Sequence, residues 1–206
     1  SKGNILNPNE IIEKYGIDQL RYYLMKEVSH GSDGNISLEN LEKCVNSDLA
    51  NNYGNLCQRV FAFIKNNCGN KIIKNKILSQ TDKKFIEEAK KLSEDLRDLM
   101  NNQNLNTYIK KVVDISFLTN KYINDEEPWK LKKTNPNRMK NVLSILIEII
   151  KRIAIMTLPI MPNKSQKLLL YLNFDFQNIN FDNYKVIFKN QIKIEKPYPL
   201  FPKYEK

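Results

Sequence analysis

Apolar side chains recur every three to four positions along most of residues 8–172, and this spacing predicts amphipathic α-helices. The longest apolar stripe lies in residues 37–68 and consists of Leu38, Leu41, Val45, Leu49, Leu56, Val60, Phe63 and Ile64. One long helix that begins at Ser37 and ends near Gly69 accounts for this stripe. Asn52 interrupts it, and we expect its amide to be buried and hydrogen-bonded inside a bundle.

The same periodicity predicts further helices over residues 8–15, 18–28, 81–99, 105–123, 139–156 and 163–172. Residues 139–156 are the most apolar of these, so this helix is expected at the bundle centre. In the helix over 105–123, Phe117 and Leu118 are both taken to face inward. A turn at residues 125–129 precedes a basic stretch.

Capping residues mark the boundaries of these helices. Asn7-Pro8 and Asn135-Pro136 each place a capping side chain before a proline in the first turn. Gly16 is predicted to end the first helix. The other predicted caps are Asp18, Ser37, Thr81, Asp82 and Asn163.

Helical periodicity fades after residue 172. Residues 173–206 hold three prolines and the alternating stretches Val186-Ile187-Phe188 and Ile192-Ile194, which indicate an extended strap. The predicted fold class is therefore all-α, a helical bundle with a small helical adaptor before it and a C-terminal strap after it. Helical bundles serve many purposes, so this pattern alone indicates no function.

Charge adds one option. The chain has 33 Lys and Arg against 23 Asp and Glu, a formal net charge of +10. Excess cations favour a polyanionic partner, because neutralised phosphates release condensed counterions. A general compositional bias explains the same excess equally well. No stretch is long and apolar enough for a membrane span.

Cys44, Cys57 and Cys68 are odd in number and lack Cys-x-x-Cys spacing, and the chain has one His. We therefore expect neither a disulfide framework nor a zinc site. Free thiols are typical of a reducing cytoplasm. No Ser/His/Asp or Cys/His constellation can be assembled, so no catalytic residue is predicted here.

The first residues resemble a known signature. Ser1-Lys2-Gly3-Asn4, followed by Asn7-Pro8, is similar to the end of the Lys-Met-Ser-Lys-Ser loop of class I aminoacyl-tRNA synthetases. Only Ser1 of that loop is present, and Lys2 stands at the variable position after it. The family's lysines that stabilise the ATP pyrophosphate would lie upstream, so we expect the chain to start inside a longer protein.

Other segments resemble one family in particular. Residues 15–24 are similar to a linker shared by several class I synthetases. Gly31-Ser32-Asp33-Gly34, Asn46-Ser47-Asp48-Leu49-Ala50-Asn51 and Glu127-Pro128-Trp129 together resemble methionyl-tRNA synthetases, and residues 199–203 resemble the usual end of that family.

Three residues are the candidate RNA-binding site. Asn55 and Arg59 are four residues apart and so share one helix face. A carboxamide can pair with the edge of an unpaired base, and a guanidinium offers a fork of donors. Trp129, the only Trp, follows a proline and could stack on a splayed base. The resemblance implies that these three residues recognise the CAU anticodon and that Trp129 stacks at its first base, cytosine.

A basic run adjoins Trp129. Its members could contact the backbone of the anticodon stem, or they could form a solvated face. The two interpretations are equally open from the sequence. The run consists of Lys130, Lys132, Lys133, Arg138 and Lys140.

The resemblance implies a division of the chain and of the reaction. Residues 1–36 would be the end of the signature loop and a helical linker to the catalytic domain, residues 37–172 the anticodon-binding domain, and residues 173–206 the strap. The parent enzyme would be a methionine–tRNA ligase that uses ATP and Mg²⁺, with zinc a further candidate in its N-terminal half. This part would hold no cofactor and be inactive alone, and its partners would be the anticodon loop of tRNA(Met) and its own catalytic domain, in the cytoplasm.

Two alternatives from other functional classes stay open. The chain could be a stand-alone, non-catalytic module that binds tRNA or another RNA. It could also be a structural helical adaptor without RNA contact. Binding of tRNA by variants of Trp129 and Lys133 would discriminate between specific recognition, charge attraction and no contact.

Overall fold

The computed structural model describes residues 7–28, 36–73, 77–174, 179, 191–194 and 199–204. The predicted all-α class is confirmed, since nearly all regular structure in this part is helical. The elements in chain order are α1 (Pro8–Tyr15), α2 (Ile17–Glu27), α3 (Leu38–Cys44), the π-helix η1 (Val45–Gly54), α4 (Asn55–Asn67), β1 (Lys71–Ile73), α5 (Gln80–Leu92), α6 (Leu96–Asn101), α7 (Leu105–Glu126), α8 (Pro128–Thr134), α9 (Pro136–Thr157), α10 (Pro162–Tyr171) and β2 (Gln191–Lys193).

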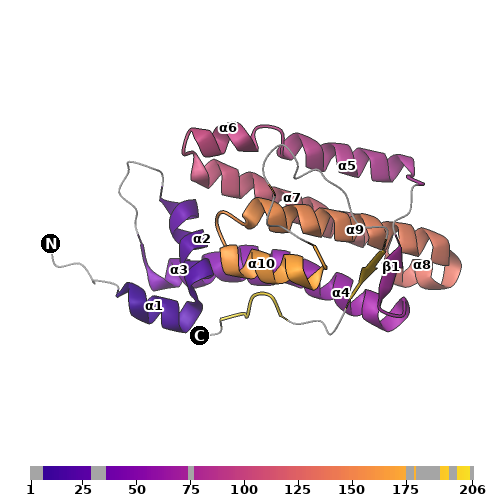
Figure 1. Cartoon of the computed structure of the whole chain (residues 1–206), viewed down its shortest axis with the longest axis horizontal. Helices are drawn as coiled ribbons and strands as arrows, with labels where there is room; N and C mark the ends of the chain where they lie inside the picture. The colour runs from indigo at the N-terminus through magenta and orange to yellow at the C-terminus, as the bar shows by residue number, and fades with distance from the viewer. Residues whose placement is uncertain are drawn as a thin grey trace.

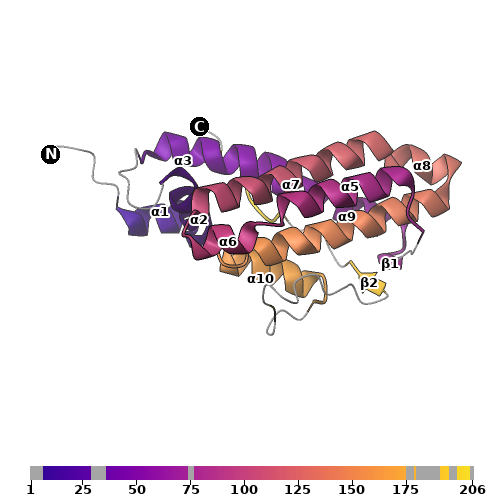
Figure 2. The ribbon, with the colours of Figure 1, turned by 90° about the horizontal axis from the view of Figure 1, so that it is seen from above.

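Two long helices form the centre of the bundle. The helices α7 and α9 pack side by side and are joined at one end by the short α8 (Figure 1). Most of α9 is buried, as its apolar sequence predicts, because α7, α4 and α10 all pack against it. Figures 1 and 2 both place α8 at the end of the molecule opposite α1 and α2. The bundle therefore separates the predicted linker from the surface that carries Trp129.

Several caps are confirmed. The side chain of Asn7 accepts from the backbone N of Asn9 at the start of α1, and Gly16 ends that helix with φ 91°. Ser37 caps α3 by accepting from the N of Asn40. Asn135 caps α9 in the same way. Each cap satisfies a backbone N–H that has no partner within its helix.

Three predicted caps are wrong. Asp18 lies inside α2, is 1% exposed, and its Oδ2 accepts from the backbone N of Lys164 at 2.6 Å. It thus satisfies the first turn of α10, where the sequence predicts Asn163 as the cap. The helix α5 begins after Ser79, not at Thr81, and Ser79 forms a capping box with Asp82.

The helix predicted over residues 37–68 is continuous but not α-helical throughout. Between α3 and α4 the chain forms the π-helix η1 over ten residues. Gly54 shows why this register needs a glycine, since a Cβ there would lie 2.9 Å from the backbone O of Leu49. The helix predicted over 81–99 is divided, because residues 93–95 form a turn between α5 and α6.

The strap packs along the bundle where it is described. The strand β2 pairs with β1 in an antiparallel ribbon, with Ile192 opposite Ile72. Near the end of the chain Asn46 makes two hydrogen bonds with the backbone of Tyr204, and Phe201 packs on Gly54. The predicted stretch Val186-Ile187-Phe188 lies outside the described residues.

Candidate nucleic-acid interface

The short helix α8 presents Trp129 at the surface. Pro128 is buried and Leu131 packs on the core, which fixes one side of the helix. Trp129 is 41% exposed on the other side. Since residues three and four apart share a helix face, Lys132 and Lys133 lie on the same exposed side as Trp129. Trp129 therefore lies within a helix, whereas the sequence predicts it at the end of a turn.

Arg59 connects the indole to two other helices. Its Cζ lies 5.6 Å from the centre of the Trp129 ring, a cation–π distance. Its Nη2 donates to Oδ1 of Asn124 on α7 at 2.8 Å. A guanidinium has five N–H donors, so this bond does not exhaust its capacity to bind a base or phosphate. The structure thus brings Arg59 and Trp129 together on a wettable surface.

Asn55 is exposed at the start of α4, one turn before Arg59. It directly follows Gly54, the last residue of η1. Both candidate polar residues thus project from the same helix, and of the two it is Arg59 that contacts Trp129. We call Asn55, Arg59, Asn124 and Trp129 the interface cluster.

Asn52 supports the surface from inside, and its predicted buried, hydrogen-bonded state is confirmed. It is 3% exposed, and its Nδ2 donates to Oγ of Ser116 at 2.6 Å. Its Oδ1 accepts from Nδ2 of Asn120 at 2.8 Å. These bonds connect η1 to α7 beside the interface cluster, which restricts movement of one helix relative to the other.

The basic run does not act as one surface. Arg138 is only partly exposed, and its guanidinium is already paired with Asp82 and Glu126. Lys130 is exposed and pairs with Glu127 at 2.7 Å. Lys132, Lys133 and Lys140 are exposed.

Two neighbouring residues are not found by sequence reasoning. Asn124 bonds Arg59 across helices, and no local pattern signals such a contact. Phe117, which is predicted to face inward, is 51% exposed. It is seven residues before Asn124, two helical turns, so the two share a face of α7. Strict periodicity could have found it, because the buried residues Val112, Ile115 and Thr119 define a stripe that excludes it.

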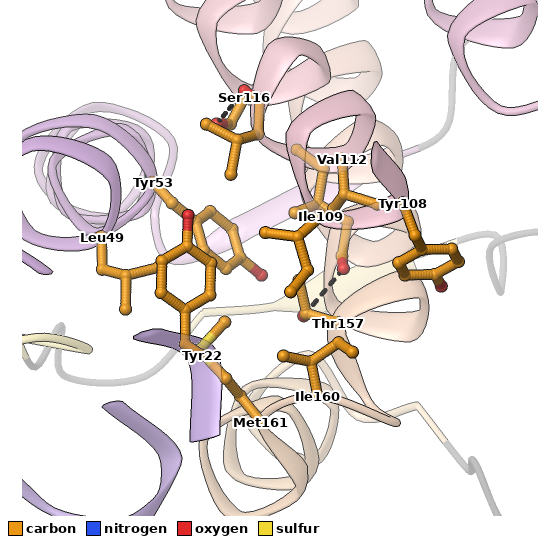
Figure 3. Close-up of a pocket in the computed structure, with 12 residues that line it drawn as sticks. Tyr22, Leu49, Tyr53, Tyr108, Ile109, Val112, Ser116, Thr157, Ile160 and Met161 are labelled. Atoms are coloured by element: carbon orange, nitrogen blue, oxygen red, sulfur yellow. Dashed lines mark hydrogen bonds between the residues drawn. The ribbon is translucent and has the colours of Figure 1, made fainter. Parts of the chain in front are cut away.

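The interior of the bundle holds one further feature, a small cavity among the described residues. A small apolar cavity of about 10 Å³ lies between α2, η1, α7 and the end of α9, with room for one water molecule (Figure 3). Tyr22 and Leu49 line one side and Ile109 and Val112 the other. No group of three or more His, Cys, Asp or Glu that could hold a metal ion exists in this part of the chain.

The thiols are poorly suited to nucleophilic chemistry. Cys44, Cys57 and Cys68 are free, and burial raises the pKa of Cys44 to about 12.

Ser1 lies outside the described residues. Within the part of the chain that the structure covers, none of the helices has the length and apolar character of a membrane span.

Comparisons with known proteins extend over the whole chain. Residues 74–204 match the family described as "Anticodon binding domain of methionyl tRNA ligase", and residues 1–61 match "tRNA synthetases class I (M)". The methionine–tRNA ligase of Brucella suis biovar 1 (strain 1330) is 37% identical over 99% of this chain, and that of Rickettsia felis is 35% identical over 100%. The chain covers 40% and 41% of these relatives, so it spans about two fifths of their length.

Solved structures give the same result. The apo form of Mycobacterium tuberculosis methionyl-tRNA synthetase matches with a TM-score of 0.90 at 27% identity, over 99% of this chain and 42% of that chain. The enzyme of the same bacterium in complex with methionyl-adenylate matches with a TM-score of 0.90 at 28% identity, over 97% and 40%. On the family match to residues 74–204 and on this agreement in fold, the chain belongs to the methionyl-tRNA synthetase family.

Proposed function

We propose that this chain binds the CAU anticodon of tRNA(Met) for a parent methionine–tRNA ligase. The observation that carries the proposal is the joining of Arg59, Asn124 and Trp129 on an exposed surface formed by three helices. Single-stranded bases are typically recognised by an aromatic platform beside donors that reach their edges. The interface cluster has both, and family membership supports this use of it.

Each side chain has a distinct task in this proposal. Trp129 stacks on the first anticodon base, cytosine, with its ring held by the guanidinium of Arg59. Asn55 can donate to and accept from a base edge, whereas Arg59 only donates. Lys132 and Lys133 contact phosphates, which adds affinity but no sequence preference.

Phe117 extends the same surface along α7. Seven residues of α-helix span about 10 Å, so its ring lies roughly that far along the axis from Asn124. An exposed aromatic ring at this distance can stack on another unpaired base of the loop. We include Phe117 in the proposed interface for this reason.

The chemical reaction would take place elsewhere in the parent enzyme. We propose residues 1–36 as the linker to its catalytic domain, residues 37–172 as the anticodon-binding domain and residues 173–206 as the strap. Methionine activation with ATP and Mg²⁺ would use the catalytic domain, in the cytoplasm. The match of residues 74–204 to an anticodon-binding domain supports placing the reaction in another part of the parent enzyme.

Competition binding tests the proposal. Labelled tRNA(Met) is bound to the chain and displaced by unlabelled tRNA(Met) or by the same tRNA with a changed first anticodon base. We expect the changed tRNA to compete at least about tenfold less well, equivalent to about 1.4 kcal/mol. Equal competition would contradict anticodon recognition. The chain alone should give no methionine-dependent ATP–pyrophosphate exchange.

A further inference from the structure

A partly buried ionic network joins the helices α5, α7 and α9 next to α8. We call Asp82, Tyr122, Glu126 and Arg138 the Asp82 network. The carboxylate of Asp82 is fully buried and accepts from both Nη atoms of Arg138, at 2.6 and 2.7 Å. It also accepts from the hydroxyl of Tyr122 at 2.6 Å. Arg138 in turn donates to Glu126 at 2.7 Å.

This network joins the two ends of the chain segment that contains α8, between Glu126 and Arg138. Glu126 is the last residue of α7 and Arg138 lies in the first turn of α9, while Trp129 is on the short helix between them. Their ion pair therefore holds the two ends of this segment together. Asp82 in the first turn of α5 binds the same guanidinium. Three long helices thus meet at one guanidinium.

The backbone at the start of this segment has a conformation that its surroundings must stabilise. Glu127 has φ 43° and ψ 60°, a left-handed conformation that side-chain-bearing residues rarely adopt. It lies directly between Glu126 of the network and Pro128, whose ring restricts rotation. A strained conformation persists only where its surroundings determine it. The conformation of Glu127 sets the angle at which α8 leaves α7.

We infer that Arg138, with Asp82 and Glu126, is a positioning residue that holds α8 so that Trp129 lies beside Arg59. The consequence for RNA binding rests on the proposed function, but the consequence for Trp129 does not. A merely stabilising network would leave the indole environment unchanged in any variant that still folds. The two roles can therefore be separated by measurements on Trp129 itself.

Glu126→Gln is the informative variant. It removes the charge that Arg138 shares with α7 but leaves Arg138 bound to Asp82, so the buried carboxylate keeps its partner. Asp95→Asn is the matched control, because the Asp95–Lys111 pair at 2.6 Å also involves α7 but lies far from α8 along that helix. Both variants remove one carboxylate charge from an ion pair.

Tryptophan fluorescence reports on one residue, since Trp129 is the only Trp of the 206 residues. We expect Glu126→Gln to shift the emission maximum and to change quenching by acrylamide, while Asp95→Asn leaves both as in the unmodified chain. Unchanged fluorescence in Glu126→Gln, or equal changes in both variants, would overturn the inference. In a longer protein with further tryptophans, ¹⁹F NMR of 5-fluorotryptophan, assigned with Trp129→Phe, gives the same readout.

A double-mutant cycle tests the route to RNA. Glu126→Gln should weaken tRNA(Met) binding by about threefold to tenfold in the unmodified chain, and have no further effect in a Trp129→Ala background. An equal loss in both backgrounds would mean that the network does not act through Trp129, and would overturn the inference. If the unmodified chain shows no anticodon preference, the proposed function fails, and the fluorescence comparison still decides the positioning role.

Discussion

Arg59 lies over the ring of Trp129, with 5.6 Å between Cζ and the ring centre, although the two residues belong to α4 and α8. The same guanidinium is bonded to Asn124 on α7. One side chain of α4 therefore contacts both α7 and the indole on α8. This arrangement makes separate predictions for the aromatic, the polar and the cationic residues around it.

Replacing Trp129 by Ala should weaken tRNA(Met) binding by about 1–3 kcal/mol, because one base loses its stacking partner. Lys133→Ala should act mildly and mainly lower the slope of log affinity against log salt, by about one unit, because it removes one phosphate contact. Titrations at several salt concentrations measure both effects. Equal losses and equal changes of slope would favour general charge attraction.

Asn55→Leu and Arg59→Met keep approximate size but remove groups that can pair with a base. We expect each to reduce the preference for the CAU anticodon by about 1–3 kcal/mol, because base-edge hydrogen bonds are lost. The measurement is competition between tRNA(Met) and a tRNA with a changed first anticodon base. Gln58→Ala, at an exposed neighbouring position of α4, is the control and should leave the preference intact.

Phe117→Ala should lower tRNA affinity while leaving the thermal midpoint nearly unchanged. The ring is half exposed, so little core packing is lost, whereas an exposed stacking surface disappears. Leu118, its more buried neighbour, provides the contrast, since Leu118→Ala should lower the thermal midpoint. A Phe117→Ala variant with unchanged affinity would remove this residue from the interface.

The fold class could be predicted because its signals are local. Apolar periodicity defines the helices, and the Asn-Pro caps of α1 and α9 act on the residues that directly follow them. The wrongly predicted cap Asp18 shows the limit, because it serves α10, which is distant in the sequence. The π-helix η1 was also not predicted, because apolar periodicity alone does not distinguish a π-helix from the flanking α-helical turns.

In the candidate site, too, local relationships could be predicted from the sequence and long-range contacts could not. Helical spacing pairs Asn55 with Arg59, and a resemblance singles out Trp129, but their joint role in RNA binding is still a prediction. The link through Asn124 and the capture of Arg138 by Asp82 are long-range contacts without a sequence pattern. The sequence groups Arg138 with surface lysines for this reason. Its neighbours along the chain give no sign of a buried carboxylate partner.

Acid should destabilise the chain through Asp82. Burial opposes ionisation of this carboxyl, but hydrogen bonds from Arg138 and Tyr122 outweigh it and hold its pKa below the ordinary value of an aspartate. A lowered folded-state pKa gives stability that is present above the unfolded value and is lost as pH falls through the folded value. Urea unfolding from about pH 7 to about pH 3 should therefore show a fall in the free energy of unfolding that begins at about pH 4.

Asp82→Asn should remove this part of the acid dependence. At neutral pH the variant should be less stable by at most about 3–5 kcal/mol, because Arg138 loses its fully buried counterion but keeps Glu126. Asp95→Asn is the control: hydrogen bonding from Lys111 lowers the pKa of Asp95 as well, but that side chain is largely exposed. An identical pH profile in Asp82→Asn and the unmodified chain would contradict the assignment.

Gly54→Ala should disturb the interface cluster through η1, the helix that directly precedes Asn55. The added Cβ would meet the backbone O of Leu49 at 2.9 Å, and backbone cannot move aside as a flexible side chain can. We expect a loss of about 1–3 kcal/mol in the free energy of unfolding, from overpacking. Because Asn55 follows directly, the shift in η1 should also reduce discrimination among anticodons.

Gly69→Ala is the matched control for this change. Gly69 has φ 60°, and a Cβ added there would meet no atom within 4 Å, so the substitution costs about 1–2 kcal/mol of backbone strain without a steric clash. Urea unfolding and the anticodon competition assay should find both variants destabilised but only Gly54→Ala altered in selectivity. The two results differ because Gly69 follows the end of α4, whereas Gly54 sets the helical register from which Asn55 projects. Equal anticodon selectivity in both variants would mean that the π-helix does not contribute to anticodon recognition.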